Sequence, residues 1–464
     1  MKNEFYGREN EKKKLYQMLQ REGLQTGLIY GRRRVGKSEL IKNVMKESSL
    51  PGIYYECKQT SEMNNVDSLA SLLADYYHFP KPSFESMEEL LDYLFRKSTQ
   101  ETLILVIDEY PYLRKVVQGM DSILQGLIDH YKDSADIKLI LCGSYVDVMK
   151  SLLMSSDPLY GRVDLTINLQ PMDYYDSSLF YSSFSNEDKV RLYSVFGGIP
   201  YYNRLIDSSL SVKENLIELI ASTGARLENE VPMYLKSEIL KITNANEVFE
   251  ALAKGYSHYS DILAQSHVSS GPTMVDVLDK LMRMEVVDRK APINDERSRK
   301  KMTYLITDKL SLFYYRYIFR YASQMRFMDP EVFFERYIEN DFETEYVPHI
   351  FEEVVSQFLI RQNRKGKLPV MFEKIGSYWY DDAENKSNGE FDVVTQDPNG
   401  YIFYEAKFRK TPVSSEMIAE EIEQVKKTSL SCYQYGFISR SGFDTKPGKN
   451  MIFYTLDDLY KADI

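Results

Sequence analysis

The chain has 464 residues, of which 43% are hydrophobic and 27% are charged, and its formal net charge is −11 at pH 7. These values indicate a soluble globular protein of about three domains, and the negative charge opposes broad, non-specific attraction to nucleic acid. The cysteines, Cys57, Cys142 and Cys432, are too far apart for a disulfide framework or a zinc site. Without a signal peptide or an apolar run near eighteen residues, we expect a cytoplasmic protein that does not span a membrane.

The first predicted element is a helix after the turn at Gly7, with Leu15, Met18 and Leu19 on one face. Phe5 and Tyr6 precede that turn, and Arg8 and Glu9 follow it. The chain therefore opens with a short apolar-Gly-Arg-Glu box ahead of its first strand.

The stretch GLIYGRRRVGKSEL, residues 27–40, has the pattern of a phosphate-binding loop between a buried strand and a helix. Its glycines allow backbone N–H groups to point at a phosphate, and the helix N-terminus adds a positive dipole. We expect Lys37 to neutralise the β- and γ-phosphates of ATP and Ser38 to bind Mg²⁺. The alternative is a glycine-rich turn that binds nothing. The predicted nucleotide contacts are Gly31, Arg32, Arg33, Arg34, Val35, Gly36, Lys37, Ser38 and Glu39.

The run LILVIDE, residues 103–109, predicts a fully buried parallel strand that ends in two acids. Asp108 is a candidate to hold Mg²⁺ through water, and Glu109 is a candidate to polarise the attacking water. The two acids could also be an ordinary strand end. After a phosphate-binding loop, the pair favours ATP hydrolysis with Lys37 and Glu109 as catalytic residues.

Strands are predicted near 27–30, 52–56, 103–107, 137–142 and 165–169, and helical stretches such as 66–78, 86–98 and 119–132 lie between them. A chain that alternates in this way forms a parallel sheet covered by helices on both faces. The predicted fold of the first third is therefore an α/β P-loop NTPase sheet.

These motifs resemble the AAA-type ATPases, in which the box around Gly7 lies near the adenine. The resemblance implies that Ser144 senses the γ-phosphate, although it could simply cap a helix. It implies that Arg162 faces a nucleotide in its own subunit or in a neighbouring copy of a homo-oligomer, although a pair with Asp164 or Asp173 is an alternative. In the turn VFGGIPYY, Pro200 resembles the proline of the signal-transducing branch, where it touches the adenine and reports nucleotide state; a structural helix break is the alternative.

Residues 246–310 read as three helices followed by a hairpin, which resembles a winged helix. The hairpin tip carries Arg297, Arg299, Lys300 and Lys301, which could grip DNA phosphates without reading sequence. A solvated hairpin, or a winged helix that packs against protein, would explain the same residues.

The stretch GEFDVVTQDPNGYIFYEAKFRK, residues 389–410, predicts two strands around a turn at 397–400. Because side chains alternate along a strand, Glu390 and Asp392 share one face, and Glu405 and Lys407 share one face. The Glu-x-Lys pair alone would be an ordinary cross-strand ion pair.

With Asp392 ahead of it, the pair resembles the PD-(D/E)XK nuclease superfamily. The resemblance implies that Asp392 and Glu405 bind Mg²⁺ and that Lys407 orients or activates water, so all three would be catalytic. It also implies that Glu352, on the helix HIFEEVVSQFLIRQ, completes the metal site. Phe391 stands where the superfamily has a proline. The basic run Arg361, Arg364, Lys365 and Lys367 could guide the substrate backbone.

Together these motifs resemble the archaeal-type ATPases that carry a C-terminal DUF234 domain. The expected domains are a P-loop ATPase domain at 1–172, a helical lid at 173–240, a winged helix at 241–310 and an α/β, restriction-endonuclease-like DUF234 domain at 311–464. The expected function is Mg²⁺-dependent ATP hydrolysis that controls a DNA-binding or DNA-cleaving domain. The alternative is a nucleotide switch, like the STAND proteins, whose last domain only binds a partner.

Overall fold

The computed structural model describes residues 5–233, 244–298, 300–382, 387–428 and 430–461. The chain divides into two compact units. Unit 1 contains Met1–Met172 and Ile199–Tyr201, and unit 2 contains Asp173–Gly198 and Tyr202–Ile464. No helix in the described part of the chain has both the length and the apolarity needed to cross a bilayer.

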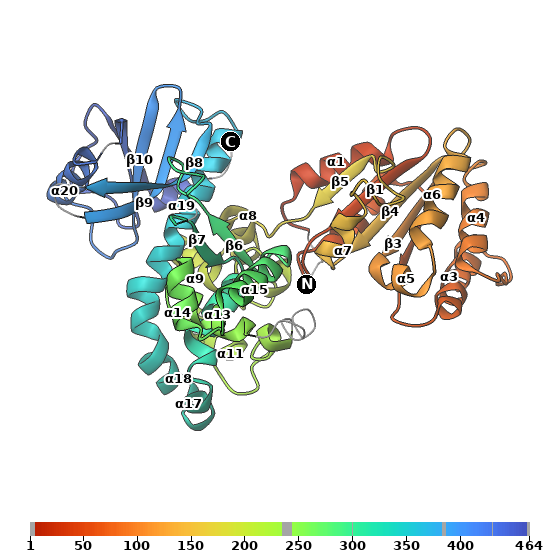
Figure 1. Cartoon of the computed structure of the whole chain (residues 1–464), viewed down its shortest axis with the longest axis horizontal. Coiled ribbons are helices and arrows are strands. Elements are labelled where there is room, and N and C mark those ends of the chain that lie inside the picture. The colour runs from red at the N-terminus through yellow and green to blue at the C-terminus, as the bar shows by residue number, and fades with distance from the viewer. Residues whose placement is uncertain (1–4, 234–243, 299, 383–386, 429, 462–464) are drawn as a thin grey trace. The chain divides into compact units, whose positions relative to one another are not determined.

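Unit 1 is built on a five-stranded parallel sheet with the order β2-β3-β4-β1-β5, which lies in the red-to-yellow part of Figure 1. All five strands that the sequence predicts are present. Their bounds are β1 Gln25–Tyr30, β2 Gly52–Glu56, β3 Leu103–Asp108, β4 Ile137–Gly143 and β5 Leu165–Asn168. This arrangement confirms the P-loop NTPase sheet, and the order brings the carboxyl ends of β1, β3 and β4 to one edge.

Helices enclose this sheet because its central strands are apolar on both faces. Every residue of β3 and β4 is buried, as expected of a parallel sheet with two covered faces. Helix α1 buries Leu15, Met18 and Leu19, the face that the sequence predicts. The helices of unit 1 are α1 Glu9–Leu19, α2 Lys37–Ser48, α3 Glu62–Tyr77, α4 Met87–Lys97, α5 Tyr110–Val116, α6 Met120–Tyr131 and α7 Val146–Ser151.

Unit 2 begins with helices and continues into the elements that the sequence predicts to form a winged helix. Three helices precede a two-stranded antiparallel sheet of β6 and β7. The elements are α8 Tyr174–Ser178, α9 Asn186–Phe196, α10 Pro200–Asn203, α11 Val212–Leu219, α13 Ala245–Ala253, α14 Tyr259–Gln265, α15 Gly271–Arg283, β6 Val287–Lys290 and β7 Thr303–Ile306. Residues 200 and 201 of α10 belong to unit 1.

A second sheet, with the order β12-β11-β10-β9-β8, forms a separate C-terminal sheet domain in unit 2. Strands β8, β9 and β10 are antiparallel neighbours, whereas β10, β11 and β12 run parallel. The predicted turn at 397–400 joins β9 to β10. The strands are β8 Lys374–Asp382, β9 Ser387–Asp397, β10 Gly400–Lys407, β11 Cys432–Ser439 and β12 Met451–Thr455.

The helical segments before and around this sheet complete unit 2. Helix α19 contacts β10, β9 and β8, and α20 contacts β11. The segments are α16 Lys309–Phe313, η2 Tyr314–Phe319, α17 Ala322–Phe327, α18 Pro330–Phe334, η3 Glu335–Glu339, η4 Phe342–Tyr346, α19 Val347–Arg364, α20 Ser415–Lys426 and α21 Leu456–Tyr460.

The segment between β6 and β7 packs against strand β8. The Asn294 side chain donates to the Trp379 carbonyl at 2.7 Å and accepts from the Trp379 amide at 3.0 Å. Ile293 joins the apolar cluster of Tyr378 and Phe391. The β6–β7 connection is therefore anchored to the C-terminal sheet domain through both hydrogen bonds and apolar contacts.

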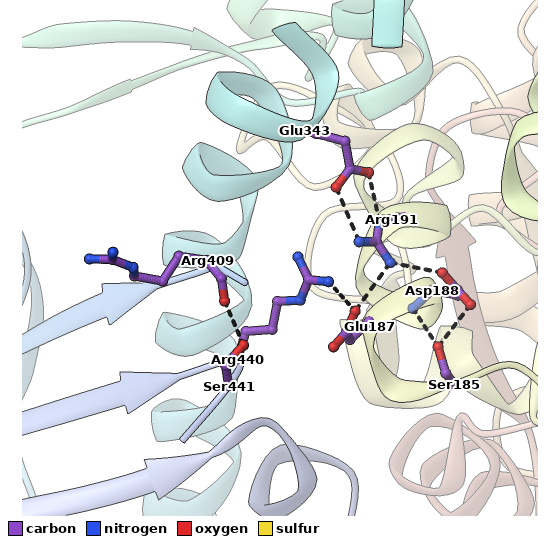
Figure 2. Close-up of polar contacts among 8 residues, drawn as sticks. All are labelled: Ser185, Glu187, Asp188, Arg191, Glu343, Arg409, Arg440 and Ser441. Atoms are coloured by element: carbon purple, nitrogen blue, oxygen red, sulfur yellow. Dashed lines mark hydrogen bonds and ion pairs between the residues drawn. The ribbon is translucent and has the colours of Figure 1, made fainter. Parts of the chain in front are cut away.

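Helix α9 is also fastened to the C-terminal half of unit 2, as Figure 2 shows. Arg191 forms two hydrogen bonds with the carboxylate of Glu343, at 2.7 and 3.1 Å. Arg440, just beyond β11, pairs with Glu187. Both guanidinium groups lie near the ring of Phe408, at 5.7 Å for Arg191 and 4.9 Å for Arg440. Ion pairs thus join α9 to Glu343 and Arg440, and a cation–π contact joins it to Phe408, the residue that follows β10.

Candidate active sites

The phosphate-binding loop between β1 and α2 depends on unusual backbone geometry. Gly31 has a φ of 153°, and a Cβ atom there would lie 2.3 Å from the Leu169 carbonyl oxygen. Gly36, at a φ of 98°, precedes α2. Arg34 adopts a φ of 67°, which is uncommon for a residue with a side chain. Only glycine tolerates the close approach at Gly31, so the loop conformation explains the sequence pattern.

Lys37 closes the loop on itself. Its buried ammonium donates to the carbonyl oxygens of Gly31 at 2.8 Å and Arg32 at 3.0 Å. A phosphate in the loop would offer charged oxygens in place of these neutral carbonyls, and charge-assisted hydrogen bonds are stronger. The lysine is therefore placed to bind an anion at this loop.

Asp108 ends β3 beside the start of α2. Its Oδ2 accepts from the Ser38 hydroxyl at 2.7 Å and also from the Tyr54 hydroxyl, while its Oδ1 accepts from the Glu109 amide at 2.9 Å. Burial by itself raises the pKa of Asp108, but hydrogen bonds from Tyr54, Cys142 and Ser38 outweigh it and leave this pKa below its usual value. The carboxylate is thus held in its charged form.

Glu109 and Ser144 face each other from the ends of β3 and β4. The Ser144 hydroxyl lies 3.0 Å from both Glu109 carboxylate oxygens, and the Ser144 amide lies 3.4 Å from one of them. Glu109 has a φ of 52°. The residue before α7 is Tyr145, so Ser144 does not occupy the N-cap position of that helix. Ser144 instead orients the acid that is the candidate to polarise water.

The segment Ile199–Tyr201 is the part of the chain beyond residue 172 that belongs to unit 1. The guanidinium of Arg34 lies 4.1 Å from the centroid of the Tyr201 ring. A Cβ atom on Gly36 would lie 3.7 Å from Cγ of Pro200. Tyr201 therefore contacts the phosphate-binding loop, and Pro200 lies beside Gly36 of that loop.

The remaining predicted loop residues surround this core. Arg33 lies 3.4 Å from the Tyr112 hydroxyl and 5.9 Å from the Tyr145 ring. The Val35 carbonyl accepts from Arg8 at 3.2 Å. Arg32 is buried, and Glu39 lies in the first turn of α2.

Arg162 forms its hydrogen bonds within unit 1. It forms two hydrogen bonds with Asp129, each at 2.8 Å, and donates to the carbonyls of Pro158 and Tyr160. Asp164, one alternative partner, accepts instead from the Thr26 amide, and Asp173, the other, pairs with Arg361. A contact between Arg162 and a nucleotide remains a prediction.

The predicted acids of the C-terminal sheet domain lie on neighbouring elements. The antiparallel register pairs Val393 of β9 with Tyr404 of β10, so Asp392 and Glu405 are the next residues toward the same end of these adjacent strands. Desolvation by surrounding protein raises the pKa of Asp392 to about 7, and the carboxylates of Glu352 and Glu390 add to this, although Asp392 still reaches solvent. Burial likewise raises the pKa of Glu405 to about 7 against the lowering effect of Lys407. The negative charges of Asp392 and Glu405 are therefore only partly neutralised by the positive groups around them.

Lys407 is held between two carboxylates. Its ammonium lies 2.5 Å from Glu405 and 2.8 Å from Glu421 on α20. Burial by itself lowers the pKa of Lys407, but these two acids outweigh it and raise the pKa above its ordinary value. The lysine is accordingly a charged hydrogen-bond donor.

Glu352, the predicted helical acid, contacts His349 one turn earlier on α19. His349 Nδ1 lies 3.1 Å from the Glu352 carboxylate. This hydrogen bond raises the pKa of His349 despite an opposing effect of burial, and Asp392 adds to the rise. The acidic cluster therefore includes a cationic histidine at mildly acidic pH.

Some of the predicted basic residues form ion pairs with acidic side chains of the same chain. Arg361 pairs with Asp173 at 3.0 Å and Asp176 at 3.2 Å. Lys301 pairs with Asp295 at 2.8 Å and lies 5.8 Å from the Trp379 ring. Arg299 lies outside the described residues.

The donor chemistry at the first site fits Mg²⁺. Ser38 and Asp108 present adjacent oxygen donors, and Mg²⁺ in phosphate sites needs only one or two protein donors beside water and phosphate. Within the part of the chain that the structure describes, no three acidic, histidine or cysteine side chains converge as a metal site. At the second site, the raised pKa values of Asp392 and Glu405 favour a cation, but this geometry does not assemble a three-donor cage.

Sequence reasoning missed Tyr54, His349 and Glu421. His349 precedes Glu352 by three residues on a helix, a spacing that predicts contact. Nothing in the local sequence marks Tyr54 or Glu421, because each meets its partner only through the tertiary fold.

Comparisons with known proteins match two parts of this chain to family models. Residues 5–205 match the model of an ATPase domain that is predominantly from Archaea. Residues 314–423 match DUF234, described as archaeal bacterial proteins of unknown function. An uncharacterized protein of Methanocaldococcus jannaschii, MJECL04, is 28% identical over 465 residues, which cover 98% of this chain and all of that relative.

A solved structure supports the fold. The Walker-type ATPase paby2304 of Pyrococcus abyssi aligns with a TM-score of 0.53 and 21% sequence identity. The alignment covers 68% of this chain and 97% of that protein.

Proposed function

Since the chain joins an archaeal-type P-loop ATPase domain to a DUF234 domain, we propose that it hydrolyses ATP with Mg²⁺ and that nucleotide state controls the C-terminal sheet domain. The observation that carries this proposal is the contact of Tyr201, which follows Pro200, with Arg34 of the phosphate-binding loop. Pro200 and Tyr201 adjoin α9 in the chain, and α9 is paired with Glu343 and Arg440 in unit 2. A change in the phosphate-binding loop can therefore reach unit 2 through the chain that connects Tyr201 to α9 and through the ion pairs of α9.

In this mechanism, Lys37 leaves the Gly31 and Arg32 carbonyls to bind the β- and γ-phosphates. Ser38 and Asp108 would hold Mg²⁺, which supplies positive charge to the phosphates when bound. Glu109, oriented by Ser144, aligns the attacking water. Loss of the γ-phosphate then removes the charge that orders the loop beneath Tyr201.

For the C-terminal domain, we propose a restriction-endonuclease-like site in which Asp392, Glu405 and Glu352 bind a divalent cation and Lys407 orients water. The raised pKa values of Asp392 and Glu405 support this assignment, because a bound dication would offset both the desolvation of these carboxylates and their smaller mutual repulsion. DNA is the proposed substrate. Lys300 and Lys301 of the proposed winged helix are candidates to contact its phosphates.

The second candidate is a nucleotide switch whose C-terminal domain only binds a partner. Two contacts favour it: Lys407 is paired with both Glu405 and Glu421, and Asn294 of the β6–β7 segment is hydrogen-bonded to Trp379. A lysine between two acids serves packing as well as catalysis, and a docked hairpin suits a protein-packing role.

Three variants distinguish these functions. Lys37→Ala should abolish ATP binding, measured by calorimetry, and unchanged affinity would refute the nucleotide site. Asp392→Ala should abolish Mg²⁺- or Mn²⁺-dependent DNA cleavage and leave ATP hydrolysis intact. If wild-type protein leaves DNA intact with every metal and nucleotide, the result favours the switch. If the protein binds DNA without cleaving it, and Lys300→Ala/Lys301→Ala weakens that binding, the result assigns DNA binding to the β6–β7 hairpin.

A further inference from the structure

Tyr54 meets the nucleotide site from strand β2. Its hydroxyl donates to Oδ2 of Asp108, the same oxygen that accepts from Ser38 at 2.7 Å. Its ring lies 4.6 Å from the ammonium of Lys42 on α2. Tyr54 thus contacts both β3 and α2, the two elements that provide the proposed Mg²⁺ donors.

The hydrogen bonds of Asp108 define what Tyr54 contributes. Asp108 is buried, its Oδ1 is held by the Glu109 amide, and its Oδ2 has two side-chain donors. A Ser38 hydroxyl that bound Mg²⁺ through an oxygen lone pair would keep its hydrogen as a donor to Asp108. Tyr54 therefore supplies a donor that holds Oδ2 whether or not Ser38 binds a cation, and the Cys142 thiol also favours the charged form of Asp108.

We propose that Tyr54 is a positioning residue for the Mg²⁺ site: its hydroxyl fixes the Asp108 carboxylate so that a water of the hydrated cation meets an oxygen already in place. Residues behind a metal donor determine its orientation, and their loss commonly weakens metal affinity by about 10–100-fold. This inference rests on the proposed Mg²⁺ role of Asp108 but does not require hydrolysis.

The test is Tyr54→Phe in the full chain. The variant keeps the ring beside Lys42 and removes only the hydroxyl. Its matched control is Tyr55→Phe on the same strand, where the hydroxyl donates instead to Asn65 at 2.6 Å, away from the phosphate-binding loop. Circular dichroism and thermal melting verify that both variants are folded.

The readout is the affinity for a fluorescent ATP analogue over a range of Mg²⁺ concentrations. We expect Tyr54→Phe to raise the half-saturating Mg²⁺ concentration about tenfold, with unchanged affinity in EDTA, and Tyr55→Phe to match wild type. An unchanged or lower value for Tyr54→Phe, or an equal rise in Tyr55→Phe, overturns the inference. So does a wild-type affinity that does not respond to Mg²⁺.

The same samples separate this inference from the proposed function. Wild-type protein that binds the analogue in a Mg²⁺-dependent manner without releasing phosphate refutes ATP hydrolysis. The comparison of Tyr54→Phe with Tyr55→Phe still decides the role of Tyr54 in that case, because it uses binding alone.

Discussion

The guanidinium of Arg34 lies 4.1 Å from the centroid of the Tyr201 ring, although 167 positions of sequence numbering separate them. Arg34 belongs to the phosphate-binding loop and adopts a left-handed φ of 67°. Such a backbone conformation costs energy for a residue with a side chain, so contacts must hold it. The tyrosine that follows Pro200 supplies one of those contacts.

Removing the Tyr201 ring should therefore weaken nucleotide binding. An exposed cation–π contact contributes about 0.5–1 kcal/mol, so Tyr201→Ala should lower ATP affinity about two- to fivefold in calorimetry. In Tyr201→Ala, ATP should also no longer change the rate of amide hydrogen exchange in α9. Tyr201→Phe is the control, because it retains the ring, and equal behaviour of the two variants would contradict a role for this contact.

Ser144→Ala should slow ATP hydrolysis while ATP affinity stays unchanged. The alanine leaves Glu109 without the hydroxyl that lies 3.0 Å from both its oxygens, and a poorly oriented base lowers kcat by about tenfold or more. Steady-state phosphate release and calorimetry measure the two quantities. Ser48→Ala removes a hydroxyl that bonds the Met45 carbonyl, so its kcat should match wild type. A fall in affinity without a fall in kcat would instead assign Ser144 to ground-state binding.

The acidic cluster should make stability decrease as pH rises. The pKa of Asp392 is about 7 in the fold and 3.8 ordinarily, so between these pH values the folded state binds more protons than the unfolded state. Stability falls with pH wherever this holds. Asp392→Asn should therefore raise Tm at pH 8 more than at pH 5.

Thermal melts at both pH values provide the measurement, and Asp444→Asn, which changes an exposed carboxyl, is the control. Mn²⁺ should raise Tm of wild type at pH 8 and have a smaller effect on Asp392→Asn. A Tm gain that is equal at the two pH values would show that charge burial is not its cause.

The ion pair between Arg440 and Glu187 should couple α9 to the C-terminal sheet domain (Figure 2). The Arg440 side chain is 9% exposed and the Glu187 side chain 39% exposed. Because one partner reaches solvent, we expect Arg440→Gln to lower the free energy of unfolding by about 1–2 kcal/mol.

A double-mutant cycle with Glu187→Gln isolates the pair. Chemical denaturation should give a double variant less destabilised than the sum of the single variants, since the second change removes an interaction already lost. Strict additivity would mean that Arg440 stabilises through Phe408 alone.

The sequence by itself determined the elements. The pattern in residues 27–40 and the apolar run at 103–107 predicted β1, β3 and the loop, because strand burial, helical spacing and glycine conformations are encoded locally. The turn at 397–400 predicted the β9–β10 hairpin for the same reason. The nucleotide-site assignments to Lys37, Asp108 and Glu109 also came from sequence, and they remain predictions of chemistry that the variants above test.

Only the tertiary structure decided which side chains meet. Tyr54 reaches Asp108, Ser144 reaches Glu109 and Tyr201 reaches Arg34 from segments distant in the chain. Glu421 likewise reaches Lys407 from a helix beyond the hairpin. Strand order and helix packing create these contacts, and both arise from burial of apolar faces over long separations, which no short window of sequence contains.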